Sequence, residues 1–280
     1  MSISPDRITY LTDYLRRESG LLLDESKLYL LRTRLLPLAR EHEFEVLDSL
    51  VDAVRRNERS ELAVKVVDVM TTNETLFFRD KYPFEALKTL IFPRLLEKGG
   101  VVPRINIWSA ASSTGQEALS IAMTAIDAVP QAERRVKIVG SDISPSVIEY
   151  CKRGVYKQME VQRGLPIQNL LKYFKQVDEH TWQVNDQLRS MVKFLHANLI
   201  SSSLTMNLRP HAPFDVVFCR NVLIYFDVEK RKHVIDQLAQ SMNVGGYLFT
   251  GAGEMVTGDH SKWEIERYEN RPIWRMVSKR

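Results

Sequence analysis

The chain has 280 residues, of which 44% are hydrophobic, and its 39 basic residues only slightly outnumber its 35 acidic residues. This length and apolar content suit one large globular domain or two smaller ones, and so small an excess of positive charge gives little support for nucleic-acid binding. No segment offers the roughly 20 apolar residues that a membrane-spanning helix needs, and the cysteines and histidines lack metal-ligand spacing. We therefore expect a cytoplasmic protein that holds no metal, enters no membrane and binds no nucleic acid.

The first 80 residues have a pattern that predicts helices only. Apolar residues recur at helical spacing over residues 8–15 and 28–38, and two more amphipathic segments follow at 45–56 and 61–70. We therefore expect residues 1–80 to form a small all-helical domain.

From about residue 104, apolar strands alternate with amphipathic helices. The predicted strands are RINIWS at 104–109, VKIVGS at 136–141, FDVVFC at 214–219 and GYLFTG at 246–251, and the predicted helices are 116–129, 146–153 and 229–242. Such alternation is typical of a parallel sheet with crossover helices on both faces, and WEIERY and IWRMVS predict a final hairpin. Residues 81–280 are therefore predicted to form a doubly wound, Rossmann-like α/β domain.

Two segments do not fit this alternation. Residues 79–98 predict a helix that is either a linker or the first helix of the α/β domain. Residues 164–187 predict a short helix and a hairpin around HTWQV. We interpret the latter as a small β-subdomain inserted at about 160–190.

The segment INIWSAASSTGQEALSIA, residues 105–122, predicts a strand, a turn and the start of a helix. Small side chains at 110–113 leave room beside the strand end, and Gly115 would let the turn pass close to a ligand. The carboxylate of Glu117 could then bind a cationic amino group, such as that of S-adenosylmethionine (SAM). Alternatively, Thr114 and Glu117 have the spacing of a capping box, and their role could be limited to capping the start of the helix.

Polar residues follow the next two predicted strands at the same edge of the sheet. Asp142 ends the second strand, where an acid often accepts hydrogen bonds from ribose hydroxyls, although it could instead cap the helix beginning near Ser144. Arg220, Asn221 and Tyr225 come directly after FDVVFC. Three polar groups so close together at the predicted ligand edge favour a binding site over a plain loop.

The segment TTNETLFFRD, residues 71–80, joins the helical part to the sheet. Thr71 and Glu74 could form a capping box, and Phe77 and Phe78 are interpreted as core residues rather than a surface for stacking bases. Packing gives no reason for the remaining polar residues, which are Asn73, Thr75 and Arg79.

Five motifs together resemble the CheR family, the bacterial chemotaxis receptor methyltransferases. They are MTTNETLFFRD, SAASSTGQEALSIA, GSDIS, ANL at 197–199 and CRNVLIYFD. Members of that family transfer the methyl group of SAM to glutamate side chains of methyl-accepting chemotaxis receptors. The products are glutamyl methyl esters and S-adenosylhomocysteine (SAH). The resemblance spans nearly the whole chain and implies the same two domains and β-subdomain as above.

The resemblance also implies roles for individual residues. Arg79 and Tyr225 become candidates for positioning the acceptor carboxylate, although Arg79 could bind the cofactor instead. Glu117 is retained, whereas Ser112, Gln116, Ala118 and Leu119 depart from the family's more usual SAACSTGEEPYS loop. The implied cofactor-binding positions are Asn73, Thr75, Arg79, Glu117, Asp142, Asn198, Leu199, Arg220 and Asn221.

The implied partners are the acidic cytoplasmic helices of chemoreceptors. The first 80 residues carry 12 basic and 15 acidic side chains, but Ser26–Arg40 contains four basic residues and no acid. These are Lys27, Arg32, Arg34 and Arg40, which form either a docking face or an ordinary solvated helix face. Family members that bind a receptor tail pentapeptide tend to have a longer, glycine-bearing turn than FKQVDEHTWQVNDQL, so we expect no tail binding, and we expect a monomer.

Two other functions remain open from sequence. One is a SAM-dependent methyltransferase acting on a metabolite or RNA. The other is a SAM-binding regulatory module without turnover, against which the presence of Arg79 and Tyr225 argues.

Overall fold

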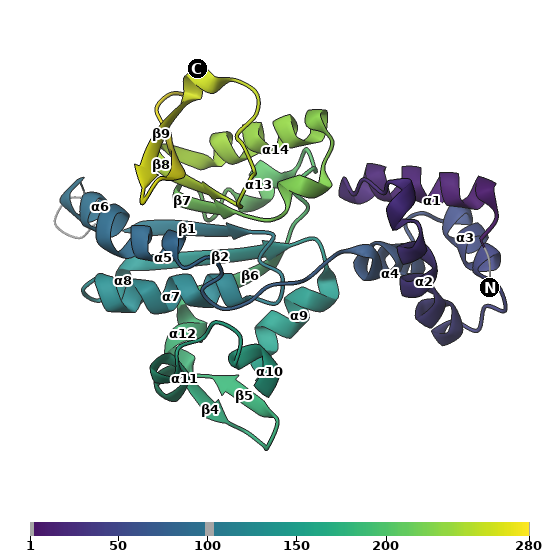
Figure 1. Cartoon of the computed structure of the whole chain (residues 1–280), viewed down its shortest axis with the longest axis horizontal. Helices are drawn as coiled ribbons and strands as arrows, with labels where there is room; N and C mark the ends of the chain where they lie inside the picture. The colour runs from purple at the N-terminus through teal and green to yellow at the C-terminus, as the bar shows by residue number, and fades with distance from the viewer. Residues whose placement is uncertain (1–2, 99–103, 280) are drawn as a thin grey trace. The chain divides into compact units, whose positions relative to one another are not determined.

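The structure, a computed structural model, describes residues 3–98 and 104–279. Its contacts divide the chain into two units, drawn in Figure 1. One unit holds the residues up to Thr72 together with Tyr225–Lys230, and the other holds Asn73–Ile224 and the chain from Arg231 onward. Among the described residues, no helix has both the length and the apolar character needed to cross a membrane.

The first unit ends at Thr72, earlier than the domain boundary expected near residue 80. The reason is that the following segment packs on the α/β unit. Phe77 is fully buried in the core of that unit, and the Ser113 hydroxyl donates a hydrogen bond to the Asn73 carbonyl at 2.7 Å.

The helical unit contains α1 (Pro5–Ser19), η1 (Glu25–Lys27), α2 (Tyr29–Glu41), α3 (Leu47–Arg56) and α4 (Glu61–Met70). Its predicted apolar stripes form the core, with Leu11, Leu15, Leu31 and Leu35 almost fully buried. Residues three or four apart lie on one face of a helix, so each helix buries one stripe against the others.

Two of the four predicted docking cations have partners in this unit, Lys27 in an exposed ion pair with Asp24 and Arg34 at the end of α4. The half-buried Arg34 on α2 donates hydrogen bonds to the carbonyls of Met70 and Thr71, both at 2.7 Å. These carbonyls lie at the carboxyl end of α4, where a cation complements the helix dipole. Arg32 and Arg40 are exposed, and their guanidinium groups make no hydrogen bond or ion pair with any residue that the structure describes.

The second unit is built on a seven-stranded sheet, which confirms the predicted α/β class. The strand order is β6-β2-β1-β7-β8-β10-β9, parallel from β6 through β8 and antiparallel at β10 and β9. The strands are β1 (Ile105–Ala110), β2 (Val136–Asp142), β6 (Val192–His196), β7 (Phe214–Cys219), β8 (Met242–Thr250), β9 (Trp263–Tyr268) and β10 (Arg271–Met276). The predicted final hairpin is therefore confirmed, whereas β6 was not predicted.

Helices cover both faces of this sheet. Figure 1 shows α7 (Gln116–Ala128) on one face and α14 (Val228–Ser241) on the other. The segment that was either linker or first helix forms α5 (Tyr82–Ala86), η2 (Leu87–Ile91) and α6 (Phe92–Lys98), and its apolar side chains lie in the core. It is thus part of the α/β unit. The remaining helices near the sheet are α8 (Ala132–Arg135), α9 (Pro145–Arg153), α12 (Asp186–Met191), α13 (Leu204–Leu208) and two short 3-10 turns, η3 (Leu223–Tyr225) and η4 (His260–Lys262).

The inserted subdomain has a three-stranded sheet in the order β3-β5-β4. Its elements are β3 (Val155–Lys157), α10 (Gln158–Val161), α11 (Ile167–Tyr173), β4 (Phe174–Gln176) and β5 (Thr181–Val184), so it begins slightly before the expected residue 160. The Phe77 ring makes edge contacts with Tyr156 at 5.5 Å and with Phe174 at 5.7 Å between ring centroids. The insert therefore packs against the segment that follows Asn73.

We expect Arg34→Ala to lower the free energy of unfolding by about 1–2 kcal/mol, because two carbonyls at the end of α4 lose their donor. Urea unfolding followed by circular dichroism measures this. The matched control is Arg40→Ala, which removes an exposed arginine from the same helix and should change stability by less than about 0.5 kcal/mol. Equal effects of the two substitutions would contradict the structural role of Arg34.

Candidate active site

The predicted site residues lie at the carboxyl edge of the parallel strands. In the sheet, β1 lies between β2 and β7. On one side of β1 the sheet continues with β2 and β6, and on the other side it continues with β7 and β8. Ligands of doubly wound sheets bind at such a switch point. Asp142 ends β2, Glu117 lies in the first turn of α7 after β1, and Arg220 and Asn221 follow β7 directly.

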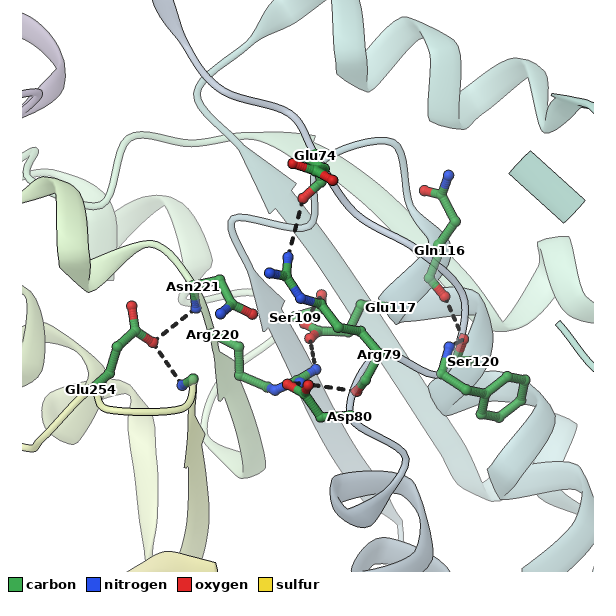
Figure 2. A network of polar contacts seen from close by, with 12 residues as sticks. Glu74, Arg79, Asp80, Ser109, Gln116, Glu117, Ser120, Arg220, Asn221 and Glu254 are labelled. Atoms are coloured by element: carbon green, nitrogen blue, oxygen red, sulfur yellow. Dashed lines mark hydrogen bonds and ion pairs between the residues drawn. The ribbon is translucent and has the colours of Figure 1, made fainter. Parts of the chain in front are cut away.

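A buried guanidinium is the centre of the polar network in Figure 2. The Arg220 side chain is only 2% exposed, and its Nη1 donates to Glu117 Oε2 at 2.8 Å. Its Nη2 donates to Asp80 Oδ2 at 2.6 Å and to the Arg79 carbonyl at 2.9 Å. One side chain thus joins three segments that are far apart in the sequence.

Glu117 is a network residue and not a helix cap. Its Oε1 accepts a hydrogen bond from the Ser109 hydroxyl at 2.8 Å, while Gly115 caps α7 without a side-chain hydrogen bond. The capping-box alternative for Thr114 and Glu117 is therefore wrong.

Packing already requires a glycine at residue 115, and its approach to a ligand stays a prediction. Its φ of +90° favours glycine, and a Cβ there would lie 3.0 Å from both the Tyr156 hydroxyl and the Phe194 ring. The Tyr156 hydroxyl also donates to the Thr114 carbonyl at 2.8 Å, so the insert supports the loop after β1.

Asp142 holds two loops by their backbone. The residue is 6% exposed, its Oδ2 accepts from Ser113 N at 2.8 Å, and its Oδ1 accepts from Ser144 N at 3.0 Å. Ser144 itself caps α9, accepting a hydrogen bond from Val147 N at 3.2 Å. The interpretation of Asp142 as the helix cap is therefore wrong.

The segment after Asn73 lies against the start of α7. Phe78 N donates to the Ser120 hydroxyl at 3.0 Å. As predicted, Phe77 belongs to the core, and the partly buried Phe78 packs against it. The half-buried Arg79 donates to the Glu74 carbonyl at 3.3 Å and forms no ion pair within the described residues. Thr75 is half-buried in the same segment, and no capping box forms here, because α4 has already ended at Met70.

The remaining predicted residues differ in their relation to this network. Ala197 N donates to the Asp142 carbonyl at 2.9 Å, which brings the following Asn198 and Leu199 to the same edge of the sheet. Tyr225 does not belong to this unit, since its carbonyl accepts from Leu22 N at 3.0 Å within the helical unit. Its role stays a prediction.

Strained backbone is concentrated in the loops of this site. Positive φ angles occur outside glycine at Phe78, Asp80, Lys81, Ala111, Ser113 and Asn221, with values of 49–66°. Such conformations cost about 1–2 kcal/mol each, and surrounding contacts must hold them in place. Backbone strain of this kind is typical of functional sites.

The site also contains a residue that the sequence analysis missed. Glu254, in the loop after β8, is 5% exposed and accepts hydrogen bonds from Gly251 N at 2.6 Å and Asn221 N at 2.8 Å. An acid following a parallel strand at the ligand edge was the available signal, as it had been for Asp142.

The charge of the site suits a ligand with a cationic group. The carboxylates of Asp80, Glu117, Asp142 and Glu254 outnumber the guanidinium groups of Arg79 and Arg220. The Glu117 side chain is 12% exposed, and a carboxylate with two protein donors can accept further hydrogen bonds. Arg220 Nε is buried without a partner among the described residues, so the site also holds a spare donor.

The two cysteines near the site are not equipped to act as nucleophiles. Burial raises the pKa of Cys219 well above its ordinary value, and burial also raises that of Cys151. Both thiols therefore stay protonated at neutral pH, and a reaction through a cysteine thiolate is disfavoured.

Comparison with known proteins gives matches over both units. Residues 7–71 match the family model described as CheR methyltransferase, all-alpha domain, and residues 73–271 match the one described as CheR methyltransferase, SAM binding domain. The chain is 38% identical over 279 residues to the chemotaxis protein methyltransferase of Vibrio parahaemolyticus, covering 99% of this chain and 98% of that protein. It is 39% identical over 254 residues to chemotaxis protein methyltransferase Cher2 of Pseudomonas putida, covering 88% and 90%.

We expect Arg220→Ala to lower the free energy of unfolding by about 3 kcal/mol, because two carboxylates lose their buried partner. Thermal unfolding measures this. The control is Arg163→Ala, which breaks a 3.3 Å ion pair between Arg163, whose side chain is 55% exposed, and Glu74, whose side chain is 71% exposed. It should lower the free energy of unfolding by less than about 1 kcal/mol. A loss for Arg220→Ala no larger than that of the control would refute a central role for Arg220.

Proposed function

Because the chain belongs to the CheR family of SAM-dependent chemotaxis methyltransferases, we propose that the site around Arg220 methylates glutamate side chains of chemoreceptors. The predicted family, cofactor and reaction class are thereby confirmed, and SAM is the methyl donor with SAH as product. The two alternatives, methylation of another substrate and SAM binding without turnover, are not favoured.

The residues at the strand ends fit the cofactor. When bound, SAM supplies a methyl group on a positively charged sulfur, which activates that group for transfer. The excess of carboxylates suits its positive charge, and Asp142 lies where an acid commonly binds ribose hydroxyls. We assign cofactor binding to Asn73, Thr75, Glu117, Asp142, Asn198, Leu199, Arg220 and Asn221, with Arg79 as a further candidate.

The acceptor needs no general base. A glutamate with a pKa of about 4.3 is already an anion at neutral pH, so catalysis consists of holding it in line with the methyl group. Orientation of this kind can contribute roughly 7–11 kcal/mol. The chain therefore has to supply a group that orients the acceptor carboxylate, and a cation suits its negative charge.

One observation carries the choice of that cation. The guanidinium of Arg220 is buried and bound to two carboxylates, whereas Arg79 is half-buried and forms no ion pair with a described residue. We propose that Arg79 positions the acceptor carboxylate, and the family resemblance implies Tyr225 as a second positioning residue. Because a long side chain without an ion pair keeps some freedom, the half-buried Arg79 can orient the acceptor without fixing it as tightly as a buried pair would.

We further propose that the receptor docks on basic residues of the helical unit. Arg32 and Arg40 are the leading candidates, because they are exposed and have no described partner. Lys27 pairs with Asp24 at 2.8 Å, an exposed ion pair that an acidic partner could replace. Arg34 contributes less than expected, since it binds the end of α4. Receptor methylation of this kind implies a cytoplasmic location, and we propose that the protein works as a monomer.

The central test is transfer from labelled SAM to receptor-rich membranes, read as methanol released in base, because methyl esters hydrolyse there and N-methyl products do not. We expect Arg79→Ala to lower the turnover rate about 100-fold with SAH binding nearly unchanged, because the acceptor loses its orienting cation. Asp142→Ala should weaken SAH binding at least about tenfold, because charged hydrogen bonds are lost.

Arg163→Ala is the matched control, because it removes another half-exposed arginine in contact with Glu74. It should leave turnover unchanged. If Arg79→Ala weakened SAH binding as much as it slowed turnover, Arg79 would be a cofactor residue instead. Full activity in both site variants would refute the proposed site.

The compact turn between β4 and β5 also supports recognition that is independent of the receptor tail. We expect a peptide with the sequence of a receptor carboxyl terminus to give no binding signal by calorimetry. A saturable signal with the tail peptide would overturn this expectation.

We expect the double substitution Arg32→Glu with Arg40→Glu to raise the KM for receptor with little change in the SAH dissociation constant.

A further inference from the structure

The loop after β8 contains a buried acid that binds only backbone donors. Glu254 Oε2 accepts from Gly251 N at 2.6 Å and Asn221 N at 2.8 Å, and its Oε1 accepts from Ile224 N at 3.2 Å. The residue is 5% exposed and forms no ion pair within residues 3–98 and 104–279. Burial of a carboxylate is costly unless donors replace its water, and three N–H groups do so here.

Two of these donors belong to the loop that carries site residues. Asn221 follows Arg220 directly and has a φ of +58°, a conformation that favours glycine. Figure 2 shows the Glu254 carboxylate facing the Asn221 backbone. The N–H groups of Asn221 and Ile224 both donate to the carboxylate of Glu254. Glu254 therefore fixes both ends of the turn that begins at Asn221.

Gly251 makes this contact possible. A Cβ at residue 251 would lie 2.5 Å from Glu254 Oε2 and 2.7 Å from Asn221 N. Only a glycine lets the loop after β8 pass this close to the loop after β7. An alanine there would push the carboxylate away from its donors.

The same device occurs on the other side of the switch point. Asp142 ends β2 and accepts from Ser113 N in the loop after the neighbouring β1. In the same way, Glu254 follows β8 and accepts from Asn221 N in the loop after the neighbouring β7. Both acceptor residues are acids at or just beyond the end of the flanking strand, and both donors have positive φ. Two loops of the site are thus held by equivalent contacts.

We propose that Glu254 is a positioning residue that holds Asn221 in the conformation needed to bind the cofactor. This inference rests on the proposed function, which assigns Asn221 to the cofactor. A glutamine cannot replace Glu254, because both carboxylate oxygens of Glu254 accept from N–H groups. In a glutamine, the amide NH₂ group would face one of these N–H groups and could not accept from it.

The experiment measures SAH binding by calorimetry for Glu254→Gln and Gly251→Ala. Each should weaken binding about tenfold, because a buried N–H of the loop loses its acceptor. The control is Asp215→Asn, which changes a carboxylate that accepts from Asn106 N at 2.9 Å and the Asn243 amide at 2.8 Å, at the other end of β7. It should leave SAH binding unchanged. Unaltered binding in both Glu254→Gln and Gly251→Ala would overturn the inference.

A double-variant cycle separates positioning from general stability. If Glu254 acts through Asn221, then Glu254→Gln should weaken binding little further in an Asn221→Ala background. Additive effects would overturn the inference. Thermal unfolding establishes that each variant is folded at the assay temperature.

Hydrogen exchange over residues 219–225 tests the same contact without the cofactor. It should be about tenfold faster in Glu254→Gln and unchanged in Asp215→Asn. Exchange as slow as in the unaltered protein would overturn the inference. Failure of the unaltered protein to bind SAH would instead refute the proposed function, and exchange would still report on Glu254.

Discussion

The buried guanidinium of Arg220 is the interaction on which the rest of the site depends. A charge that is 2% exposed must be compensated, and Arg220 finds Glu117 from α7, Asp80 from the segment before α5 and the carbonyl of Arg79. The planar fork of arginine can reach all three partners, which a lysine ammonium could not do with the same geometry. The ends of β1 and β7 and the segment after Asn73 are therefore held as one structure.

This constraint gives the two arginines of the site different work. The charge of Arg220 is paired with carboxylates inside the protein. Arg220 therefore affects a ligand mainly by its electrostatic field and by holding Glu117 in place. Arg79 owes its backbone position to Arg220 Nη2, yet its own side chain has only a 3.3 Å hydrogen bond to the Glu74 carbonyl. A cation with a fixed backbone and a free side chain suits an acceptor that must enter and leave in every catalytic cycle.

The sequence predicted the strands and helices well because their patterns are local. It missed β6, because Val192–His196 is short, lies at the edge of the sheet and includes exposed Lys193 and His196. It could not decide whether Glu117 was a cap or a site residue, since T-x-x-E spacing suits both. The partner that decides, Arg220, lies 103 residues further along the chain. The packing requirement for Gly115 was missed for the same reason, because Tyr156 and Phe194 become its neighbours only in the fold.

The arrangement of acids explains how strained loops persist at this edge of the sheet. In the order β2-β1-β7-β8, the loops after the two central strands contain the strained Ser113 and Asn221. Their N–H groups donate to Asp142 at the end of β2 and to Glu254 in the loop after β8. The Arg220 pair with Glu117 then joins the two central segments to each other. A residue with left-handed backbone conformation is stable only where several contacts hold it in place. Here each such residue is held by a carboxylate from a neighbouring segment and by its own strand. The cost of the strained loops is thus offset by hydrogen bonds from their backbone N–H groups to buried carboxylates.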